Sequence, residues 1–361
     1  MNFLERTLYN IFFLCYRWFP FSWFEILLNK YENRLIHKYL LKGKTVKPTA
    51  IPTINAYDLT EKNFKKLSNN YRKPVLIKGF MKEAPAVKKW SLEYLSDIIE
   101  GDFKLNCVSY DQGLQVVPLT FRQYMERKEE NIYINNNHTL ISHFSQLFND
   151  IKERFLLLKA ILHRIPKHIH IANLFIGYGK KKGSHLHCGG SGNFFVQIAG
   201  RKHWTFIDPK YSSSLKGRLS ESGIHAQTLF DMPDSCISTT PEIFHYMPRY
   251  EVELEPGDIV WNAPWWWHRI HNTNDGLNIG MAIRLNKVTK LNLQNNWLYT
   301  LSGYTYVLYN SFLISLYEKL CLNEDEYFSS SKDEAEKSNV LYQIEQLTKK
   351  YPTTLTLKNI I

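Results

Sequence analysis

The sequence predicts an all-β core, a double-stranded β-helix or jelly-roll barrel, with α-helical extensions at both ends. Between residues 168 and 285, apolar and polar residues alternate with a period of two, which is typical of strands. Eight short runs separated by turn residues suit a closed barrel or sandwich. These predicted strands cover 169–178, 184–188, 193–199, 202–207, 250–254, 258–262, 267–271 and 277–285.

Three regions follow from the change in pattern along the 361 residues. Residues 1–47 form an aromatic and basic helical extension, and Pro48 and Pro52 mark a linker after it. Residues 48–285 form the barrel domain with an N-terminal α/β portion. Residues 286–361 form a C-terminal helical region. The connection over 209–248 lacks periodicity, so we expect an irregular loop that covers the mouth of the barrel.

The α/β portion is expected to alternate short helices and strands. Ser91 and Thr120 precede helical patterns and are predicted N-caps, because their hydroxyls can accept the first free backbone N–H groups. The predicted buried strand Lys73–Gly79 ends on a glycine. Further elements are expected as a helix over 64–69 and strands over 105–110 and 131–134.

The two extensions raise the question of partners. Basic residues outnumber acidic ones in 1–47, and no apolar run there reaches the roughly 20 residues that span a bilayer. This extension therefore either lies on an anionic membrane surface or packs on the body or a second subunit. The uncharged segment Trp297–Tyr317 has a helical apolar stripe, which predicts a packed helix or a homodimer contact.

Net charge and cysteine content indicate which partners and which cellular compartment to expect. The formal charge of +11 permits an anionic partner, but the basic residues are scattered. The five cysteines contain no CxxC pair, which indicates a reducing compartment without a disulfide framework. We therefore expect a cytoplasmic protein, with peripheral membrane contact as the alternative that residues 1–47 leave open.

Histidines on separate predicted strands form the candidate site. His185 and His187 are two residues apart on one strand, so regular alternation places them on one face. His268 arrives much later, on another strand. Imidazoles from distant strands of a barrel suit a mid-series transition metal with open coordination positions.

The residues around these histidines match a known motif. His187 is followed at the expected spacing by Asn193 and by a run that ends in Gly200-Arg201-Lys202. A second motif reads Gly257-Asp258, then Pro264-Trp265-Trp266-Trp267-His268. Over residues 50–285 the chain resembles the JmjC/cupin-like (cupin-8) family of Fe(II)- and 2-oxoglutarate-dependent oxygenases, in particular its small hydroxylase branch.

The resemblance implies a cofactor set and residue roles. His187 and His268 would be iron ligands, and Lys202 would bind the distal carboxylate of 2-oxoglutarate. Asn193 and Ser184 would line the co-substrate pocket. The implied reaction is oxidation of an unactivated C–H bond on a small molecule, a protein or a nucleic acid.

One position departs from the family pattern, because Gly189 stands where the family has its metal-binding aspartate. Three interpretations stay open. In the first interpretation, a chloride or bromide ion takes the place of the missing carboxylate, which would make the chemistry halogenase-like. Alternatively His185 completes the site, or the barrel is an inactive binding or scaffold protein. Trp265, Trp266 and Trp267 either wall the metal or pack the barrel.

Overall fold

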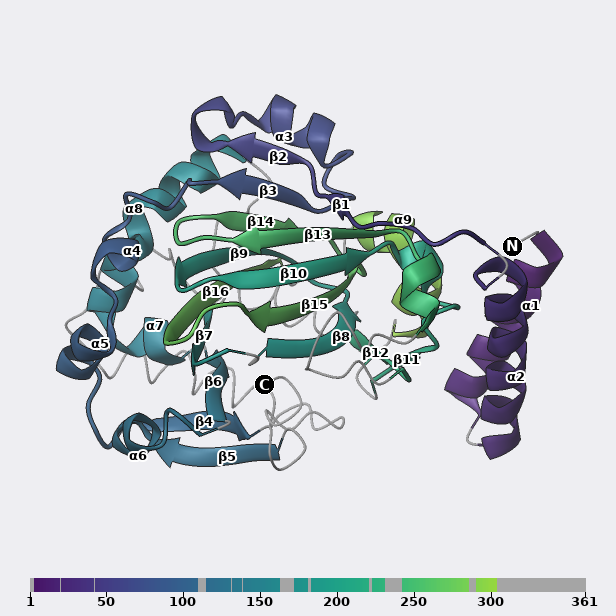
Figure 1. Cartoon of the computed structure of the whole chain (residues 1–361), viewed down its shortest axis with the longest axis horizontal. Coiled ribbons are helices and arrows are strands. Elements are labelled where there is room, and N and C mark those ends of the chain that lie inside the picture. The colour runs from purple at the N-terminus through teal and green to yellow at the C-terminus, as the bar shows by residue number, and fades with distance from the viewer. Residues whose placement is uncertain are drawn as a thin grey trace, which may run out of the picture.

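The computed structural model describes the residues that Figure 1 draws in colour. They are 3–19, 21–41, 43–109, 115–130, 132–137, 139–162, 172–180, 183–220, 223–230, 242–285 and 290–303. Predictions for 169–171 and for most of Trp297–Tyr317 lie outside these residues. The boundaries between the three regions stay predictions.

Two large sheets form the body, in agreement with the predicted β core. The first has seven strands in the order β1-β13-β10-β15-β8-β12-β11, and the second has nine in the order β2-β3-β14-β9-β16-β7-β6-β4-β5. The strands of the first sheet are β1 (Thr49–Ala50), β8 (Gly183–Gly189), β10 (Lys202–Ile207), β11 (Gly217–Leu219), β12 (His225–Thr228), β13 (Arg249–Leu254) and β15 (Trp267–Asn272). Those of the second are β2 (Thr53–Asn55), β3 (Val75–Lys78), β4 (Lys104–Ser109), β5 (Gln115–Thr120), β6 (Ile132–Asn137), β7 (Ala172–Tyr178), β9 (Gly192–Ala199), β14 (Ile259–Asn262) and β16 (Leu277–Leu285).

The eight predicted strands are present to within a few residues as β7 to β10 and β13 to β16. The prediction of an irregular loop over 209–248 was wrong for its described part. That stretch contains β11 and β12, and β12 pairs with β8. Strands of three and four residues are too short to show a period in sequence. They widen the sheet that carries the candidate site.

Helices cover the ends of the sheets (Figure 1). Ser91 and Thr120 are N-caps as predicted, and Thr120 forms a full capping box with Gln123. The strand β5 was not predicted. The helices are α1 (Phe3–Trp18), α2 (Ser22–Tyr39), α3 (Glu61–Leu67), α4 (Pro85–Lys89), α5 (Leu92–Ile98), α6 (Phe121–Glu126), α7 (Thr139–His143), α8 (Ser145–Ile161) and α9 (Lys290–Ser302), with 3-10 turns at 56–58, 209–211 and 242–246.

Asp258 of the Gly-Asp motif has a structural role. Its carboxylate accepts hydrogen bonds from the backbone N–H groups of Gly79, at 2.8 Å, and Glu255, at 3.0 Å. It thereby ties β3 to the turn before β14. Gly257 has φ +95, and a Cβ there would lie 2.8 Å from the backbone of Lys82, so only glycine fits this close approach.

The helices α1 and α2 form a hairpin that packs on the outer side of the first sheet. Phe13 and Leu28 of the hairpin share a buried cluster with Leu186 and Cys188 of β8. A buried ion pair fixes the contact, because Arg218 of β11 donates to both carboxylate oxygens of Glu32, at 3.0 and 2.8 Å. The extension is therefore packed on the body. Among the described helices, none is both long and apolar enough to cross a bilayer.

Candidate metal centre

Two histidines face each other across neighbouring strands. His187 of β8 is the direct register partner of His268 of β15, and their ring centroids are 4.2 Å apart. Paired residues on adjacent antiparallel strands project to the same face of the sheet. The structure therefore brings together the two predicted iron ligands, which are 81 residues apart in sequence (268 − 187).

Backbone carbonyls set the orientation of both rings. The Nδ1 of His187 lies 2.8 Å from the carbonyl oxygen of His185, and the Nδ1 of His268 lies 2.9 Å from that of Trp266. A carbonyl only accepts, so each Nδ1 is the donor and each Nε2 keeps its lone pair. This is the tautomer in which an imidazole binds a metal through Nε2.

Burial keeps both rings neutral. It lowers the pKa of His187 to about 4, with smaller repulsion from His225, Arg284 and His185. It lowers the pKa of His268 well below the usual range, with His187 and Arg284 adding to the effect. No carboxylate of the described chain appears among these influences. Two neutral imidazoles are ready to accept a cation at pH 7.

A β-bulge separates Ser184 from His187. His187 pairs with His268, but Ser184 pairs with Ile270, so β8 contains one extra residue there. The bulge brings Ser184 to the face of His268, where its hydroxyl is buried without a partner in the described chain. His185 lies within the bulge, so simple alternation does not place its ring beside that of His187.

No group of three His, Cys, Asp or Glu side chains in the described residues has a geometry that holds a metal. The metal-ligand role of His185 remains a prediction. Beside His187 lies the carbonyl of His185, and no third side chain among the described residues completes a metal-binding group with the two rings.

Gly189 leaves room where the family pattern has a carboxylate. A Cβ built there would meet only one atom within 4 Å, the carbonyl oxygen of Ile224 at 3.7 Å. Across the ladder, Gly189 is the register partner of His225 on β12. The backbone at Gly189 is held, because its carbonyl accepts from the N–H of Trp265 at 2.6 Å. The vacated position is thus open but fixed in place.

Lys202 is a buried cation, 7% exposed, on the inner face of β10. Its ammonium donates to the Asn272 Oδ1 at 2.6 Å, and Asn272 donates in turn to the carbonyl of Gly179. Burial lowers the pKa of Lys202 to about 8. No acidic residue of the described chain pairs with it. A buried ammonium without a carboxylate favours binding of an acidic ligand.

A row of polar side chains faces the histidines from the second sheet. Asn262 of β14, Asn193 of β9 and Arg284 of β16 are register partners across three adjacent strands. Asn262 lies 3.3 Å from both ring nitrogens of His268 through its Nδ2. The Oδ1 atoms of Asn193 and Asn262 are buried without described partners. Unsatisfied acceptors of this kind favour a bound ligand or water.

The tryptophans divide between packing and the site. The indole N–H groups of Trp265, Trp266 and Trp267 donate to Thr300, to the carbonyl of Arg72 and to Ser212, respectively. These three rings therefore pack the barrel against neighbouring elements. The ring that stacks on His268 belongs to Trp204, at 5.6 Å between centroids and 19° between planes.

Sequence reasoning missed four residues here, namely Asn262, His225, Asn272 and Arg284. Asn262 and Arg284 occupy inward positions of predicted strands, and two polar residues inside a barrel were the available signal. His225 gave no signal, because its short strand was not predicted.

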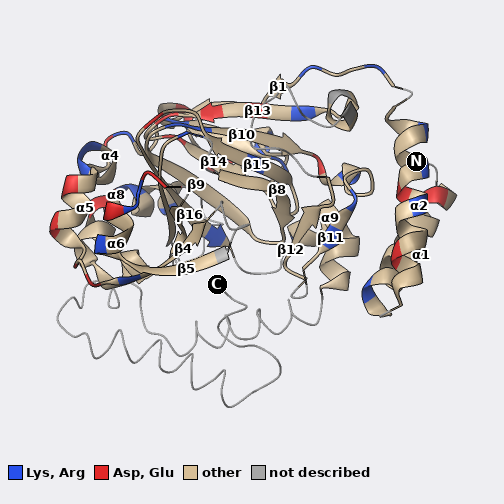
Figure 2. Cartoon of the chain, turned by 60° about the horizontal axis from the view of Figure 1, so that its bottom comes forward, with Lys and Arg blue, Asp and Glu red and all other residues tan. Residues whose placement is uncertain are grey.

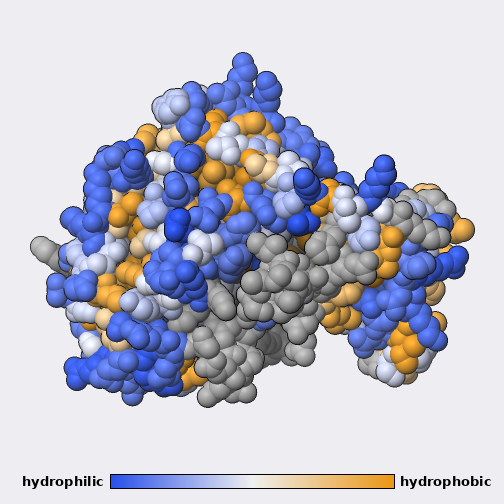
Figure 3. Space-filling model, in the orientation of Figure 1, coloured by the Kyte–Doolittle hydropathy of each residue, from blue (hydrophilic) through white to orange (hydrophobic). Residues whose placement is uncertain are grey.

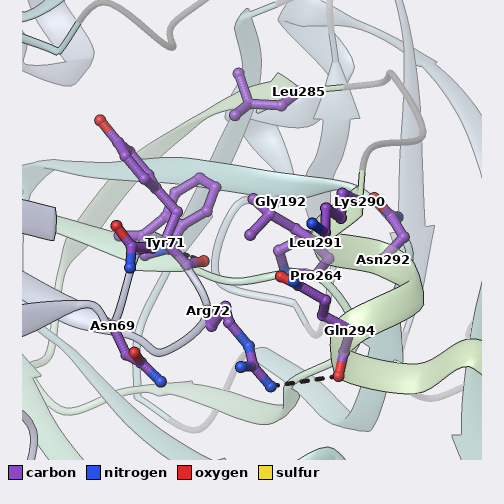
Figure 4. Close-up of a pocket in the computed structure, with 12 residues that line it drawn as sticks. Asn69, Tyr71, Arg72, Gly192, Pro264, Leu285, Lys290, Leu291, Asn292 and Gln294 are labelled. Atoms are coloured by element: carbon purple, nitrogen blue, oxygen red, sulfur yellow. Dashed lines mark hydrogen bonds between the residues drawn. The ribbon is translucent and has the colours of Figure 1, made fainter.

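One cavity lies outside this centre. It has a volume of about 610 Å³, and Figure 4 shows residues that line it, among them Arg72, Gly192 and Gln294. The guanidinium of Arg72 donates to the carbonyl oxygen of Gln294 there. None of the predicted site residues lines it, so the cavity is separate from the histidine pair.

The fold and this centre define a barrel protein with strand-borne metal-ligand candidates. Comparison with protein families matches residues 61–286 to the cupin-like domain. The match covers more than half of the chain, and the chain belongs to the family of cupin-like domain proteins.

Curated relatives are similar at low identity. The chain is 30% identical over 105 residues to the 2-oxoglutarate and iron-dependent oxygenase JMJD4 of Mus musculus, covering 28% of this chain and 22% of the relative. It is 23% identical over 235 residues to the human tRNA wybutosine-synthesizing protein 5, covering 58% and 70%. It is 25% identical over 231 residues to the Lysine-specific demethylase 8 of Xenopus tropicalis, covering 62% and 50%.

These matches span less than a quarter of JMJD4 and about half of the demethylase. The donor set of this chain fits an iron ion with two imidazoles, and it fits a dicarboxylate co-substrate with Lys202 and the two unsatisfied polar groups at Ser184 and Asn193. The third protein ligand is the part that does not match.

Proposed function

We propose that this protein is an Fe(II)- and 2-oxoglutarate-dependent oxygenase that oxidises an unactivated C–H bond. The observation that carries the proposal is the neutral His187 and His268 pair, each ring oriented by a backbone carbonyl at Nδ1, in one interior with a buried Lys202 that no described carboxylate pairs. The names of the oxygenase relatives support the same class. Iron, when bound, supplies the activation of oxygen that such a reaction needs.

The chain's own residues bind and orient the reactants. His187 and His268 would hold the iron through Nε2, and the Lys202 ammonium would hold the distal carboxylate of 2-oxoglutarate. Trp204 stacks on His268 and limits its rotation. Apolar walls that include Phe206 exclude water, which strengthens the pairing of Lys202 with a carboxylate.

Gly189 leaves two outcomes for the oxidised carbon. Hydroxylation converts R–H, 2-oxoglutarate and O₂ into R–OH, succinate and CO₂. Halogenation converts R–H, 2-oxoglutarate, O₂, a halide ion and a proton into R–X, succinate, CO₂ and water. The open space at Gly189 and the absence of a described carboxylate near the histidines favour a halide as the missing negative charge.

The first experiment measures binding and turnover in the full chain. Under anaerobic conditions, Fe(II) with 2-oxoglutarate should bind in stoichiometric amounts and give a metal-to-ligand charge-transfer band. In air the protein should then release succinate. Purified protein that binds no iron and forms no succinate would instead favour an inactive binding or scaffold barrel.

A second experiment separates the two outcomes. Gly189→Asp restores a carboxylate where a Cβ has space, so it should fold normally. If a halide occupies this position, wild-type protein shows a band that shifts with chloride or bromide, and G189D does not. Equal spectra with and without halide in the wild type would leave hydroxylation as the reaction.

A further inference from the structure

Arg284 is half-buried and brings a positive charge to a centre that has no carboxylate among its described residues. Arg284 lies on β16 and faces inward beside its register partner Asn193 of β9. Its charge lowers the pKa of His187, His225 and His268. Burial lowers the pKa of Arg284 itself to about 10, so it stays charged at neutral pH. Within the described chain no hydrogen bond or ion pair involves Arg284.

A charge that is partly withdrawn from water without a counter-ion is costly, and proteins pair such groups. The place for the counter-ion is suggested by the ladder. Gly189 offers open space, and its register partner His225 is a donor or a cation but never an anion. The groups whose charges act on the rings of His187 and His268 are histidines and Arg284, and none of them is an acid.

We infer that Arg284 is the anchor of an anion-binding subsite beside the His187 and His268 pair, opened by Gly189 and bordered by His225. The ligand is a small monoanion, either a free halide ion or an anionic group of the substrate. This inference rests on the proposed function for its biological use, but the binding itself needs neither iron nor turnover.

The test measures anion binding by metal-free and Zn(II)-loaded protein. Excess line width of the ³⁵Cl resonance reports chloride, and bromide and acetate serve as competitors. Wild type and Arg284→Lys should broaden the line, and Arg284→Met should lose at least about tenfold in affinity, because a charge-assisted contact contributes about 1.5–3 kcal/mol. Arg201→Met is the control, since Arg201 is exposed and paired with Glu253.

Each outcome has a clear meaning. Displacement by bromide alone indicates a free halide, and displacement by acetate as well indicates the anionic group of a substrate. Broadening that is equal in R284M and wild type, or missing from both, overturns the inference. Binding that depends on Arg284 in a protein without succinate release would leave this subsite standing while the proposed function fails.

A second, independent inference concerns the exposed surface of the N-terminal hairpin formed by α1 and α2. Leu4, Ile11 and Trp18 are seven residues apart on α1 and form one exposed stripe, 48–65% exposed. Phe19, Phe21 and Trp23 surround the turn to α2, each 51–56% exposed. We define these six residues as the hairpin edge, and Figure 3 shows hydrophobic residues on the surface of this hairpin.

The charges beside the hairpin edge favour an anionic partner. Two of the three acids in the helices of the hairpin are neutralised, because Glu5 pairs with Lys38 and Glu32 with Arg218. Arg6, Lys30 and Arg34 are exposed and have no ion pair in the described chain. Figure 2 shows basic residues on both helices. Aromatic rings next to lysines and arginines are typical of contacts with the bilayer interface.

We propose that the hairpin edge docks the protein on an anionic lipid bilayer. The hairpin is held rigidly by the buried Arg218–Glu32 pair, so the apolar edge is presented as a preformed surface. Docking of this kind needs no transmembrane helix, in agreement with the absence of a candidate span among the described helices.

The test uses the full chain and vesicles of phosphatidylcholine with or without phosphatidylglycerol. Wild type should sediment with the anionic vesicles, less so in high salt, because the attraction of basic residues is screened. The variant Trp18→Ser/Phe21→Ser/Trp23→Ser should lose most binding, and Lys30→Gln/Arg34→Gln should lose about 1 kcal/mol per charge removed, or about fivefold each. Val116→Ser, an exposed apolar residue elsewhere, is the control.

Circular dichroism verifies that each variant is folded. Wild type that does not sediment with anionic vesicles overturns membrane docking, as does an edge variant that binds like the wild type. A wild-type dimer that the edge variant converts into a monomer would show that a second copy of the chain covers this edge.

Discussion

Two histidine pairs lie on neighbouring strands of the same sheet, and only one of them has the features of a metal centre. The inner pair is His187 and His268. The outer pair is His203 of β10 and His271 of β15, register partners with ring centroids 5.0 Å apart. Alternation along β10 and β15 places this second pair on the opposite face. Two close imidazoles are therefore not sufficient to define a site.

What differs is the surroundings. The Nδ1 atoms of the inner rings are held by backbone carbonyls, and a buried lysine without a carboxylate shares their interior. His203 of the outer pair instead lies 3.8 Å from Glu251, and exposed Arg201 nearby is already paired with Glu253. The outer face has its charges balanced by its own residues, whereas the inner face needs ligands from outside.

The largest expected effect is the loss of iron from the inner pair. His187→Ala or His268→Ala should reduce iron affinity and succinate formation by on the order of 100-fold or more, since each removes a direct ligand. The matched control is the double variant His203→Ala/His271→Ala. Iron content after dialysis and succinate release measure both, and loss of iron from the outer variant would contradict the distinction.

Lys202, the first residue of β10, and Arg201, which directly precedes this strand, allow the same contrast. Lys202→Met removes the charge offered to the distal carboxylate, so the Kd of 2-oxoglutarate should rise about 10- to 100-fold. Arg201→Met, on the outer face, should change it less than about twofold. Titration with 2-oxoglutarate, followed by tryptophan fluorescence, gives both constants. An equal response of the two variants would remove Lys202 from the co-substrate site.

The sequence was sufficient to predict the inner pair and Lys202 because a resemblance fixed their spacing and period-two alternation fixed their faces. The bulge in β8 could not be predicted from the sequence, because one extra residue changes the strand pairing without changing the local pattern of residues. His225 was missed for a related reason, since a four-residue strand becomes visible only when it pairs with β8. The outer pair shows that register, rather than composition, decides which histidines meet.

Titration of Lys202 provides a pH test of the same contrast. Its pKa in the free protein is about 8, lowered by burial, so the amine loses its charge as the pH rises through about 8. The affinity for 2-oxoglutarate should then fall by up to about tenfold per pH unit above that value. Lys202→Arg should bind with little pH dependence between pH 7 and 9.5, because a guanidinium stays charged there. Identical pH profiles for wild type and K202R would assign the titration to another group.

The smallest expected effects come from the groups that position each pair. Asn262→Ala removes the amide that lies 3.3 Å from both nitrogens of His268, so the ring loses an orienting contact and iron affinity should fall about tenfold. Glu251→Gln removes the attraction that raises the pKa of His203 against the effect of burial, so that pKa should drop, as ¹H–¹⁵N spectra of the imidazole would show. Iron affinity should not change in E251Q, because the carboxylate belongs to the outer face. If E251Q lowered iron affinity as much as N262A, the two faces of the sheet would be coupled, and the inner pair would not be an independent centre.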